Sequence, residues 1–503
     1  MKFLHSLILT AILSIAVFGC RMGPDYSRPT TAADTGSFVR IPVDWIDPND
    51  PEAVGPWWKS FNDPLLDELI AEALAENHDI QSAAAAVMES QALLDSAFGA
   101  RLPSANYSAS RTRAKSVSLF PGFESEPMTS YSQELSISYI VDVFGRLRRA
   151  ERAARDDLAA ATETERTVVH SIIATVVRTR VSIATQQRLL EVARRNVDSR
   201  KNTLSVVERR YRQGLLSPVD IYLARENIAS VQSQVPQLEQ GILLASNGLD
   251  VLTGRRPGTH QELPATLAEM PELSPIPVGL PAALLDRRPD VRVAERRLAA
   301  ATERVGVNIA AMYPDLSLTA AGGYQSDSFR MLTASENQVY AAVMGLTAPI
   351  FRGGQLKAQV DAAEARVKRL AAEYAKTVLT AMREVEDALV RCEKLSDRLV
   401  SLQIRLAEAS RARQLALDRY SQGVDSILTV LETERRHILA ETELVTTRGD
   451  LYNARIDLYL ALGGDWLQAA TRHPADVTGT ARPPENPSPR ILSLDTKPTI
   501  DQE

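Results

Sequence analysis

Two long stretches of the chain carry apolar or small residues at alternating spacings of three and four. They cover residues 145–212 and 355–422; neither contains proline, and Gly145 is their only glycine. This spacing is typical of amphipathic α-helices. An unbroken helix of this length is roughly 100 Å long at 1.5 Å per residue. Because each apolar stripe continues to the end, both helices are predicted to lie against other helices for their whole length.

Four shorter stretches alternate apolar and polar residues with a period of two, which is typical of β-strands with two unlike faces. Leu135 and Ile137 share one face of the second stretch, and Ser136 and Ser138 share the other. Helical patterns at 65–98 and 287–312 precede the first and third stretches. The predicted strands are residues 104–113, 131–143, 315–324 and 338–351.

The chain is a tandem duplication. Superimposing Tyr211 on Tyr420 also superimposes Gly214 on Gly423, and each copy has the order helix, two strands, long helix, glycine turn and helix. A glycine can take the left-handed conformation that ends a helix. Gly214 and Gly423 therefore predict the tips of two helical hairpins.

The N-terminus has the pattern of an export signal. In residues 1–19 a single lysine precedes an apolar run that is too short to span a bilayer. The tetrad ending at Cys20 resembles the lipobox of bacterial lipoproteins, although Phe18 is bulkier than the usual residue there. An ordinary signal peptide with an incidental cysteine is the alternative. Lipidation is favoured because the chain has only one other cysteine, Cys392. In the mature chain no intrachain disulfide could use Cys20 without it.

Composition excludes several classes of function. The 503-residue chain has a net charge of −6, which argues against nucleic acid as a partner. No run of eighteen consecutive apolar residues follows Cys20, so no transmembrane helix is predicted. The six histidines do not have metal-ligand spacing, and no phosphate-binding loop or nucleophile elbow occurs. We therefore expect no enzyme, cofactor or metal.

Four strands are too few for a membrane barrel. A transmembrane barrel needs at least about eight strands, and an open sheet edge in lipid is prohibitively costly. If the strands enter a membrane, several copies of the chain must share one barrel.

Several motifs resemble those of the outer-membrane efflux proteins, the TolC-like channels of tripartite pumps, in their lipoprotein branch. They are CRMGPDYSRP from Cys20, WWKSFNDPLLDELIAEALAENHDI from Trp57, DVFGRLRRA from Asp142 and LTAPIFRGGQLKA from Leu346. The resemblance extends to about Gly464, and Arg21 after the cysteine favours the outer membrane.

This resemblance implies an α+β membrane protein in which three chains build a transmembrane β-barrel, four strands each, continued by a periplasmic barrel of long helices. The expected partners are two further copies, outer-membrane lipid, a periplasmic membrane-fusion adaptor and an inner-membrane RND-type transporter. The expected segments are a signal peptide (1–19), an extended arm (20–64), the first repeat (65–254), an equatorial connector (255–281), the second repeat (282–464) and a disordered tail (465–503).

The resemblance also places a periplasmic gate at the hairpin tips. In the second tip, Leu428, Glu432 and Arg435 share a helix face because they are spaced by four and three. Asp220 is also a good helix cap, and Glu432 with Arg435 is compatible with a plain solvated pair. The residues assigned to the gate are Tyr420, Asp425, Leu428, Glu432, Arg435 and, from the first tip, Asp220.

Two functions from different classes fit the helices: a passive export channel, and a periplasmic coiled-coil structural or adaptor lipoprotein. An adaptor would not need strands with an apolar outer face. The four alternating strands occupy equivalent places in the duplication and therefore favour the channel. The transported compound is not encoded in any of these patterns.

Acylation of Cys20 gives the first testable prediction. Cys20→Ser should abolish incorporation of radiolabelled lipid, because the thiol is the atom that receives the acyl group. Cys392→Ser is the matched control and should keep full labelling. Labelling of Cys20→Ser at the parental level would contradict the assignment.

Overall fold

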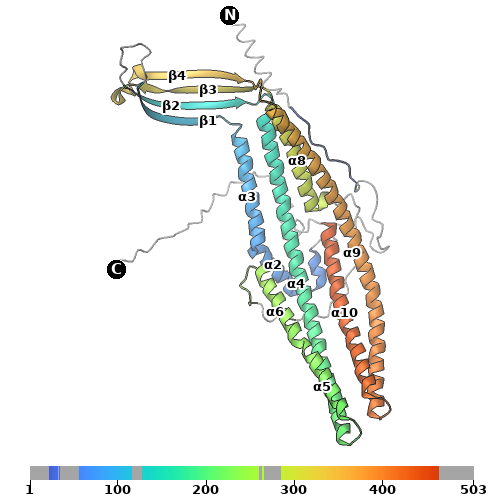
Figure 1. Ribbon diagram of the computed structural model, residues 1–503. Helices are drawn as coiled ribbons and strands as arrows, with labels where there is room; N and C mark the ends of the chain where they lie inside the picture. Colours follow the sequence, from blue (N-terminus) through green and yellow to red (C-terminus); the bar gives the residue numbers. More distant parts are fainter. Residues whose placement is uncertain are drawn as a thin grey trace, which may run out of the picture.

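The computed structural model describes residues 22–31, 33, 56–115, 127–259, 263–264 and 285–463. The signal peptide, Cys20, the C-terminal tail and most of the arm and connector lie outside the described residues. In the described part, a four-stranded sheet stands at one end of long helices and two hairpin tips stand at the other (Figure 1).

The arm ends in the 3-10 helix η4 Trp57–Phe61. The first repeat contains five α-helices and two strands: α2 Pro64–Glu76, α3 His78–Gly99, β1 Ser104–Ala114, β2 Met128–Val141, α4 Arg146–Arg212, α5 Pro218–Gln232 and α6 Gln234–Leu252. The second repeat contains α8 Pro289–Ala310, β3 Asp315–Ser326, η5 Phe329–Met331, η6 Ser335–Asn337, β4 Gln338–Thr347, α9 Gln355–Ser421 and α10 Ile427–Leu462.

The two predicted long helices are confirmed. Helices α4 and α9 have 67 residues each. Each begins after a glycine in the left-handed region, Gly145 with φ 77° and Gly354 with φ 81°. The shorter helices differ from the prediction, since the pattern at 65–98 forms α2 and α3 rather than one helix. Asn77 ends α2, and its side-chain oxygen accepts hydrogen bonds from the amides of Asp79 and Ile80, which caps α3.

The first copy is also interrupted beyond its tip. Helix α5 ends at Gln232 and α6 begins at Gln234, whereas α10 in the second copy is continuous over 36 residues. Pro236 lies in the first turn of α6, where it has no N–H to donate to the preceding turn. The duplication is therefore only approximate in the returning helices.

The four strands form one antiparallel sheet in the order β1-β2-β3-β4. Its two halves come from different repeats and join through β2 and β3. Strand β2 ends before Asp142, whose carboxylate accepts hydrogen bonds from the amides of Leu147 and Arg148 and so caps α4. Strand β4 ends at Thr347, earlier than predicted, because Pro349 cannot donate to a strand ladder.

The register gives β1, β2 and β3 one mostly apolar and one mostly polar face, whereas β4 is apolar on both, with Val339, Ala341 and Val343 opposite the Tyr340 side. Tyr107 pairs with Leu135, Leu135 pairs with Gly322, and Gly322 pairs with Tyr340, so one row crosses all four strands. The side chains of this row are exposed, and Tyr340 is 89% exposed. The opposite face carries serine, threonine, asparagine and glutamate on β1, β2 and the start of β3. The apolar face belongs to residues Ala105, Tyr107, Ala109, Leu135, Ile137, Tyr139, Val141, Leu316, Leu318, Ala320, Tyr340, Ala342, Met344 and Leu346.

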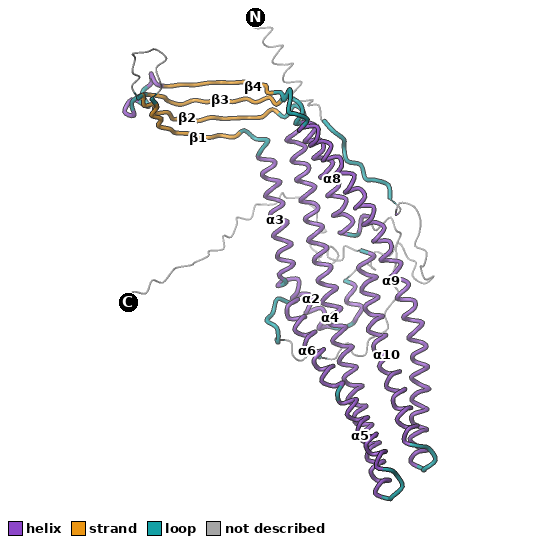
Figure 2. The backbone as a smooth tube through the Cα atoms, in the orientation of Figure 1, coloured by secondary structure: helices purple, strands orange, loops and turns teal. Residues whose placement is uncertain are grey.

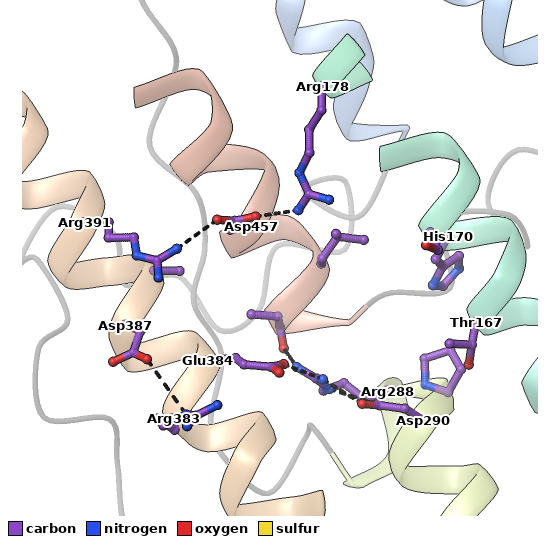
Figure 3. A pocket seen from close by; sticks show the side chains of 15 residues that line it. Thr167, His170, Arg178, Arg288, Asp290, Arg383, Glu384, Asp387, Arg391 and Asp457 are labelled. Carbon is purple, nitrogen blue, oxygen red and sulfur yellow. Dashed lines mark hydrogen bonds and ion pairs between the residues drawn. The ribbon is translucent and has the colours of Figure 1, made fainter. Parts of the chain in front are cut away.

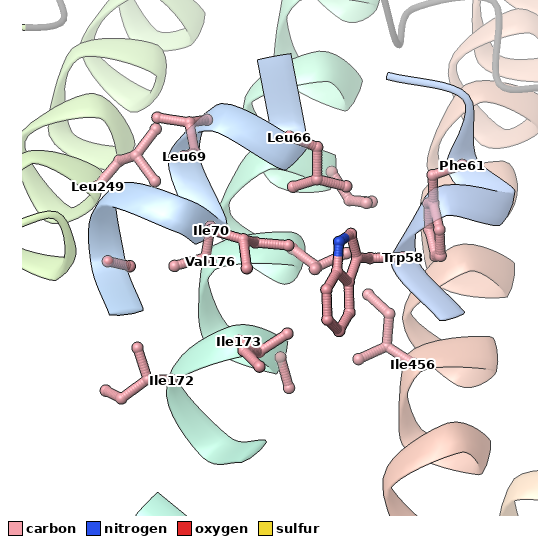
Figure 4. Packing of buried hydrophobic residues seen from close by; sticks show 14 of the residues in the cluster. Trp58, Phe61, Leu66, Leu69, Ile70, Ile172, Ile173, Val176, Leu249 and Ile456 are labelled. Carbon is pink, nitrogen blue, oxygen red and sulfur yellow. The ribbon is translucent and has the colours of Figure 1, made fainter. Parts of the chain in front are cut away.

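The main hydrophobic core lies halfway along the helices, where η4 and α2 pack against α4 and α10 (Figure 4). Trp57, Trp58 and Phe61 are buried there, and the Trp57 ring stacks on Tyr459 at 5.0 Å. Both tryptophans therefore serve core packing, with about 150–250 Å² of surface to bury on each such side chain.

A buried ion pair fastens the start of the first repeat to this core. The Nε atom of Arg180 on α4 donates to Oδ2 of Asp63 at 2.8 Å, and both side chains are completely buried. Arg180 also donates to the carbonyl oxygen of Pro264 at 2.7 Å. One arginine thus links the segment before α2 and the connector to α4.

One helix in the described part of the chain, α4, is long and apolar enough to cross a membrane, with a mean hydropathy of 1.2 over its best window. Of that window, 61% is buried inside the chain, which is typical of a core helix in a helical bundle.

The buried pair generates the second prediction. Asp63→Asn keeps the side-chain shape but leaves the Arg180 charge uncompensated, which should destabilise the protein by about 3–5 kcal/mol. Thermal unfolding followed by circular dichroism in detergent would measure the loss. Glu68→Gln, an exposed position on α2, is the control and should leave the transition unchanged. Equal transitions for the two variants would contradict a stabilising role for the pair.

Candidate functional site: the hairpin tips

The two predicted tips lie together at the end of the molecule remote from the sheet (Figure 2). Gly214 and Gly423 have φ values of 76° and 82°, as the prediction requires. In the first tip the amide of Leu215 donates to the carbonyl of Arg210 at 3.1 Å. In the second tip, the amide of Val424 donates to the carbonyl oxygen of Arg419 at 3.0 Å. Both tips therefore use the same left-handed glycine cap.

Tyr420 joins the two tips. Its side chain is only 2% exposed and packs in a small core with residues of both hairpins, Val207, Ala224, Ala416, Ile427 and Val430. The guanidinium of Arg210 lies over the Tyr420 ring at 4.7 Å, and its Nη1 atom donates to the Tyr420 carbonyl oxygen. A cation over an aromatic face contributes about 0.5–2 kcal/mol.

The electrostatic surroundings of Tyr420 include both tips. Burial raises the pKa of the Tyr420 phenol, the Asp220 carboxylate adds to the rise, and Arg210 opposes it. The phenol is therefore neutral at periplasmic pH. Its oxygen is buried and has no hydrogen-bond partner among the described residues.

Asp220 caps its own helix. The Ser217 amide donates to Oδ2 of Asp220 at 3.0 Å, and the Ser217 hydroxyl accepts from the Val219 amide at 3.3 Å. This reciprocal arrangement is a capping box. The hydrogen bond of Asp220 therefore caps its own helix. Asp220 acts on Tyr420 only through its negative charge.

In the second tip, Asp425 is held by Arg419, whose Nε donates to Oδ2 at 2.8 Å. Leu428 has no comparable partner and is 61% exposed. The structure therefore brings Tyr420 and Asp220 near each other but leaves Leu428 on the surface of the single chain.

Glu432 receives two arginines from its own helix. Arg435 binds both carboxylate oxygens at 2.8 Å, and Arg436 donates to Oε1 at 2.7 Å. The hydrogen bonds from Arg435 and then Arg436 lower the pKa of Glu432 to about 2. Glu432 therefore stays ionised throughout the physiological range. The solvated-pair alternative for Glu432 and Arg435 fits their contacts within one chain.

Arg210 is a tip residue that the sequence reasoning missed. The duplication aligns it with Arg419, because Tyr211 aligns with Tyr420. The aligned arginines differ in their contacts, since Arg419 binds Asp425 in its own tip and Arg210 reaches the other hairpin. Comparing the residue before each tip tyrosine would have identified Arg210 as a candidate.

A cavity of about 440 Å³ lies farther up, where α4, α8, α9 and α10 meet (Figure 3). Its charged side chains pair with one another. Asp457 accepts from Arg178 and Arg391, and Arg288 donates to Asp290 and Glu384 at 2.7 Å each. Within the described ranges, no three His, Cys, Asp or Glu side chains are grouped as metal ligands.

A sheet with one apolar face at the end of paired helices of about 100 Å defines a class of outer-membrane channel proteins with a periplasmic helical domain. The chain belongs to the outer membrane efflux protein family, whose model matches residues 69–255 and 280–464. The two matches coincide with the two copies of the duplication. The predicted fold class, outer-membrane location and efflux function are confirmed at this level.

Three relatives show how far the similarity extends. The toluene efflux pump outer membrane protein TtgF of Pseudomonas putida is 32% identical over 91% of this chain and 96% of its own length. The pyoverdine export outer membrane protein OpmQ of Pseudomonas aeruginosa is 33% identical over 87% and 94%. The solved outer-membrane channel OprN is 30% identical with a TM-score of 0.81, covering 89% of this chain and all of that one.

The tip contact supplies the third prediction. Arg210→Met keeps the length of the side chain but removes the cation over Tyr420 and the hydrogen bond to its carbonyl. Losing about 1–2 kcal/mol should speed amide hydrogen exchange in residues 418–427 by roughly 5- to 30-fold. Mass spectrometry of the exchanged peptides measures the rate.

Arg209→Met is the matched control, because Arg209 is adjacent and exposed. It should leave exchange in the second tip unchanged. Identical exchange in Arg210→Met and the parent would mean that the two tips are joined by the small hydrophobic core alone.

Proposed function

We propose that three copies of the chain form an export channel, in which a shared β-barrel crosses the outer membrane and a helical tube continues it through the periplasm. The observation that carries this proposal is the two-faced sheet. Its apolar face suits lipid, and its polar face suits a water-filled interior. A coiled-coil structural lipoprotein would have no use for an exposed apolar sheet face.

The two sides of the protomer, one at β1 and α3 and the other at β4 and α9, support a head-to-tail assembly. Strands β1 and β4 end the sheet on opposite sides, and each has one edge unpaired within the chain. Helix α3, next to β1, buries none of its residues within the chain. On the other side, α9 exposes Val400, Ile404 and Leu415, a stripe that the charged pair Glu408–Arg411 interrupts. Joining one side to the other generates a closed ring and covers both.

The number three comes from the family resemblance, and twelve strands satisfy the minimum for closure. In this ring the tips narrow the periplasmic end. Exposed Leu428 would form a hydrophobic constriction, and Glu432, one turn farther from the tip, a cation-attracting ring. Tyr420, Asp425, Arg435 and Asp220 would hold these helices in place, and Arg210 joins this group.

The proposed solute is a small molecule. It reaches the channel from an energised transporter, because nothing in the described residues supplies energy for transport. The relatives named for toluene and pyoverdine export differ widely in solute. Selection is therefore assigned to the expected RND-type transporter and its periplasmic adaptor. Acylated Cys20 adds a second membrane anchor.

Assembly and conduction form the fourth prediction. The full-length protein in mild detergent should have the mass of a trimer and should conduct ions across a planar bilayer. A stable monomer with full strand content would overturn the shared barrel, and a trimer that never conducts would overturn the channel.

Substitutions on the two sheet faces sharpen this test. Ile137→Arg puts a charge on the apolar face and should destabilise the trimer by about 2–4 kcal/mol near the bilayer midplane. Ser136→Arg places the same side chain one residue away on the polar face and should keep the trimer. Equal trimer yields in outer membranes from the two variants would argue against lipid at the apolar face.

A further inference from the structure

A polar layer separates the core of the tips from the central cores. Helix α4 contributes Asn196, Arg200 and Thr203, which share a face because they are spaced by four and three. Helix α10 contributes Glu434. Arg200 lies roughly 18 Å from the tip end of α4, at 1.5 Å per residue. The layer thus lies on both hairpins, nearer to the tips than to the sheet.

Glu434 is the buried charge at the centre of this layer, with 2% of its surface exposed. The Thr203 hydroxyl donates to its Oε1 atom at 2.8 Å and so connects the two hairpins. Arg200 is also buried and donates to the carbonyl oxygen of Asn227 on α5. Three helices from two hairpins therefore meet through polar contacts as well as apolar packing, since Val197, Ile228 and Ala440 are buried near the same level.

Several polar atoms of the layer are buried without a hydrogen-bond partner among the described residues. They are Asn196 Nδ2, Arg200 Nε, Arg413 Nε, Glu434 Oε2 and His437 Nδ1. Buried polar groups in folded proteins are nearly always satisfied, by water where no protein group is available. Both donors and an acceptor are present, so water molecules can bridge them. A hydrated layer is easier to open than a dry apolar one.

We propose that the layer around Glu434 is a hydrated, titratable hinge between the two hairpins, through which periplasmic pH regulates opening of the tips. This inference rests on the proposed channel function and adds a regulatory input to it. The tip core moves as one unit below the hinge, and the central cores stay fixed above it.

The charged groups that face Glu434 come from every packed helix. Arg200 lies on α4 and Arg413 on α9, and Glu226 on α5 faces Arg200. Burial raises the pKa of Glu434 above its ordinary value of 4.5, and the Thr203 hydrogen bond, Arg200 and Arg413 oppose this rise without cancelling it.

His437 lies one turn farther along α10. Burial lowers its pKa below 6.5, Arg413 and Arg195 lower it further, and Glu441 opposes them. His437 is therefore neutral near pH 7, and its protonation at acidic pH is disfavoured in the closed packing, which opposes the effect of Glu434.

The direction of the effect follows from proton linkage. A carboxyl group whose pKa is raised in the closed packing holds its proton more tightly there than in an open, hydrated packing. Protonation therefore stabilises the closed tips fully below pH 4.5, and this stabilisation is lost as pH rises through the raised pKa. Between the two pKa values, the open-to-closed ratio should rise by up to about tenfold per pH unit in each protomer.

Planar-bilayer recordings of the full-length protein test the hinge. Open probability of the parent should rise as pH increases above 4.5. Glu434→Gln keeps the shape of the neutral acid and should hold the low open probability across this range. Glu443→Gln is the matched control on α10, because Glu443 forms a half-exposed pair with Arg405 at 2.7 Å. It should keep the parental pH response.

Thr203→Val gives an independent variant that retains the acid. Its loss of the hydrogen bond to Glu434 should shift the response to higher pH, since that bond lowers the pKa of the carboxyl. A parental response in both Glu434→Gln and Thr203→Val would overturn the hinge. Absence of conductance in the parent at every pH would instead contradict the proposed channel function, and the trimer mass of each variant separates misassembly from altered gating.

Discussion

Unpaired backbone groups at a sheet edge are the constraint on which the architecture depends. In lipid, each unsatisfied N–H or C=O group costs several kcal/mol, because no water is available to replace the missing strand. The antiparallel sheet ends in β1 on one side and β4 on the other, and its apolar face is exposed. In the proposed trimer, closing the barrel removes every edge, and the same head-to-tail contact covers α3 and the exposed stripe of α9.

The core halfway along the helices is packed more firmly than the hairpin tips. Around η4 and α2, aromatic packing and the fully buried Arg180–Asp63 pair connect distant segments to α4. Near the tips, by contrast, the two hairpins meet through one small core, through Arg210 over Tyr420, and through the polar layer at Glu434. Apolar packing resists separation more than hydrated polar contacts do. A channel that opens at the tips needs this gradient of stability along its helices.

Divergence between the two copies is concentrated where the proposed function needs asymmetry. Both tips keep the glycine turn and a serine cap, Ser217 and Ser426. Arg210 and Arg419 are aligned, yet one bridges the hairpins and the other binds Asp425 in its own turn. Asp220 completes a capping box, while the aligned position in α10 is Thr429. The duplicated backbone is thus retained, and the side-chain contacts have changed around it.

Local periodicity allowed the long helices, the four strands, the repeat and the tips to be predicted from the sequence. The spacing of apolar residues and the position of a glycine act over a few neighbouring residues, so these features need no knowledge of distant partners. The same local reasoning failed at Asn77 and Asp142, where a side-chain cap ended an element that the apolar pattern would have continued.

Only the tertiary structure decided which distant groups meet. The pairing of β2 with β3, the burial of Glu434 beside Thr203, and the reach of Arg210 to Tyr420 each join residues at least 175 positions apart. Nothing local distinguishes Glu434 from exposed glutamates on the same helix. Its burial and raised pKa arise because α4, α5 and α9 pack around it, and that packing depends on the whole fold.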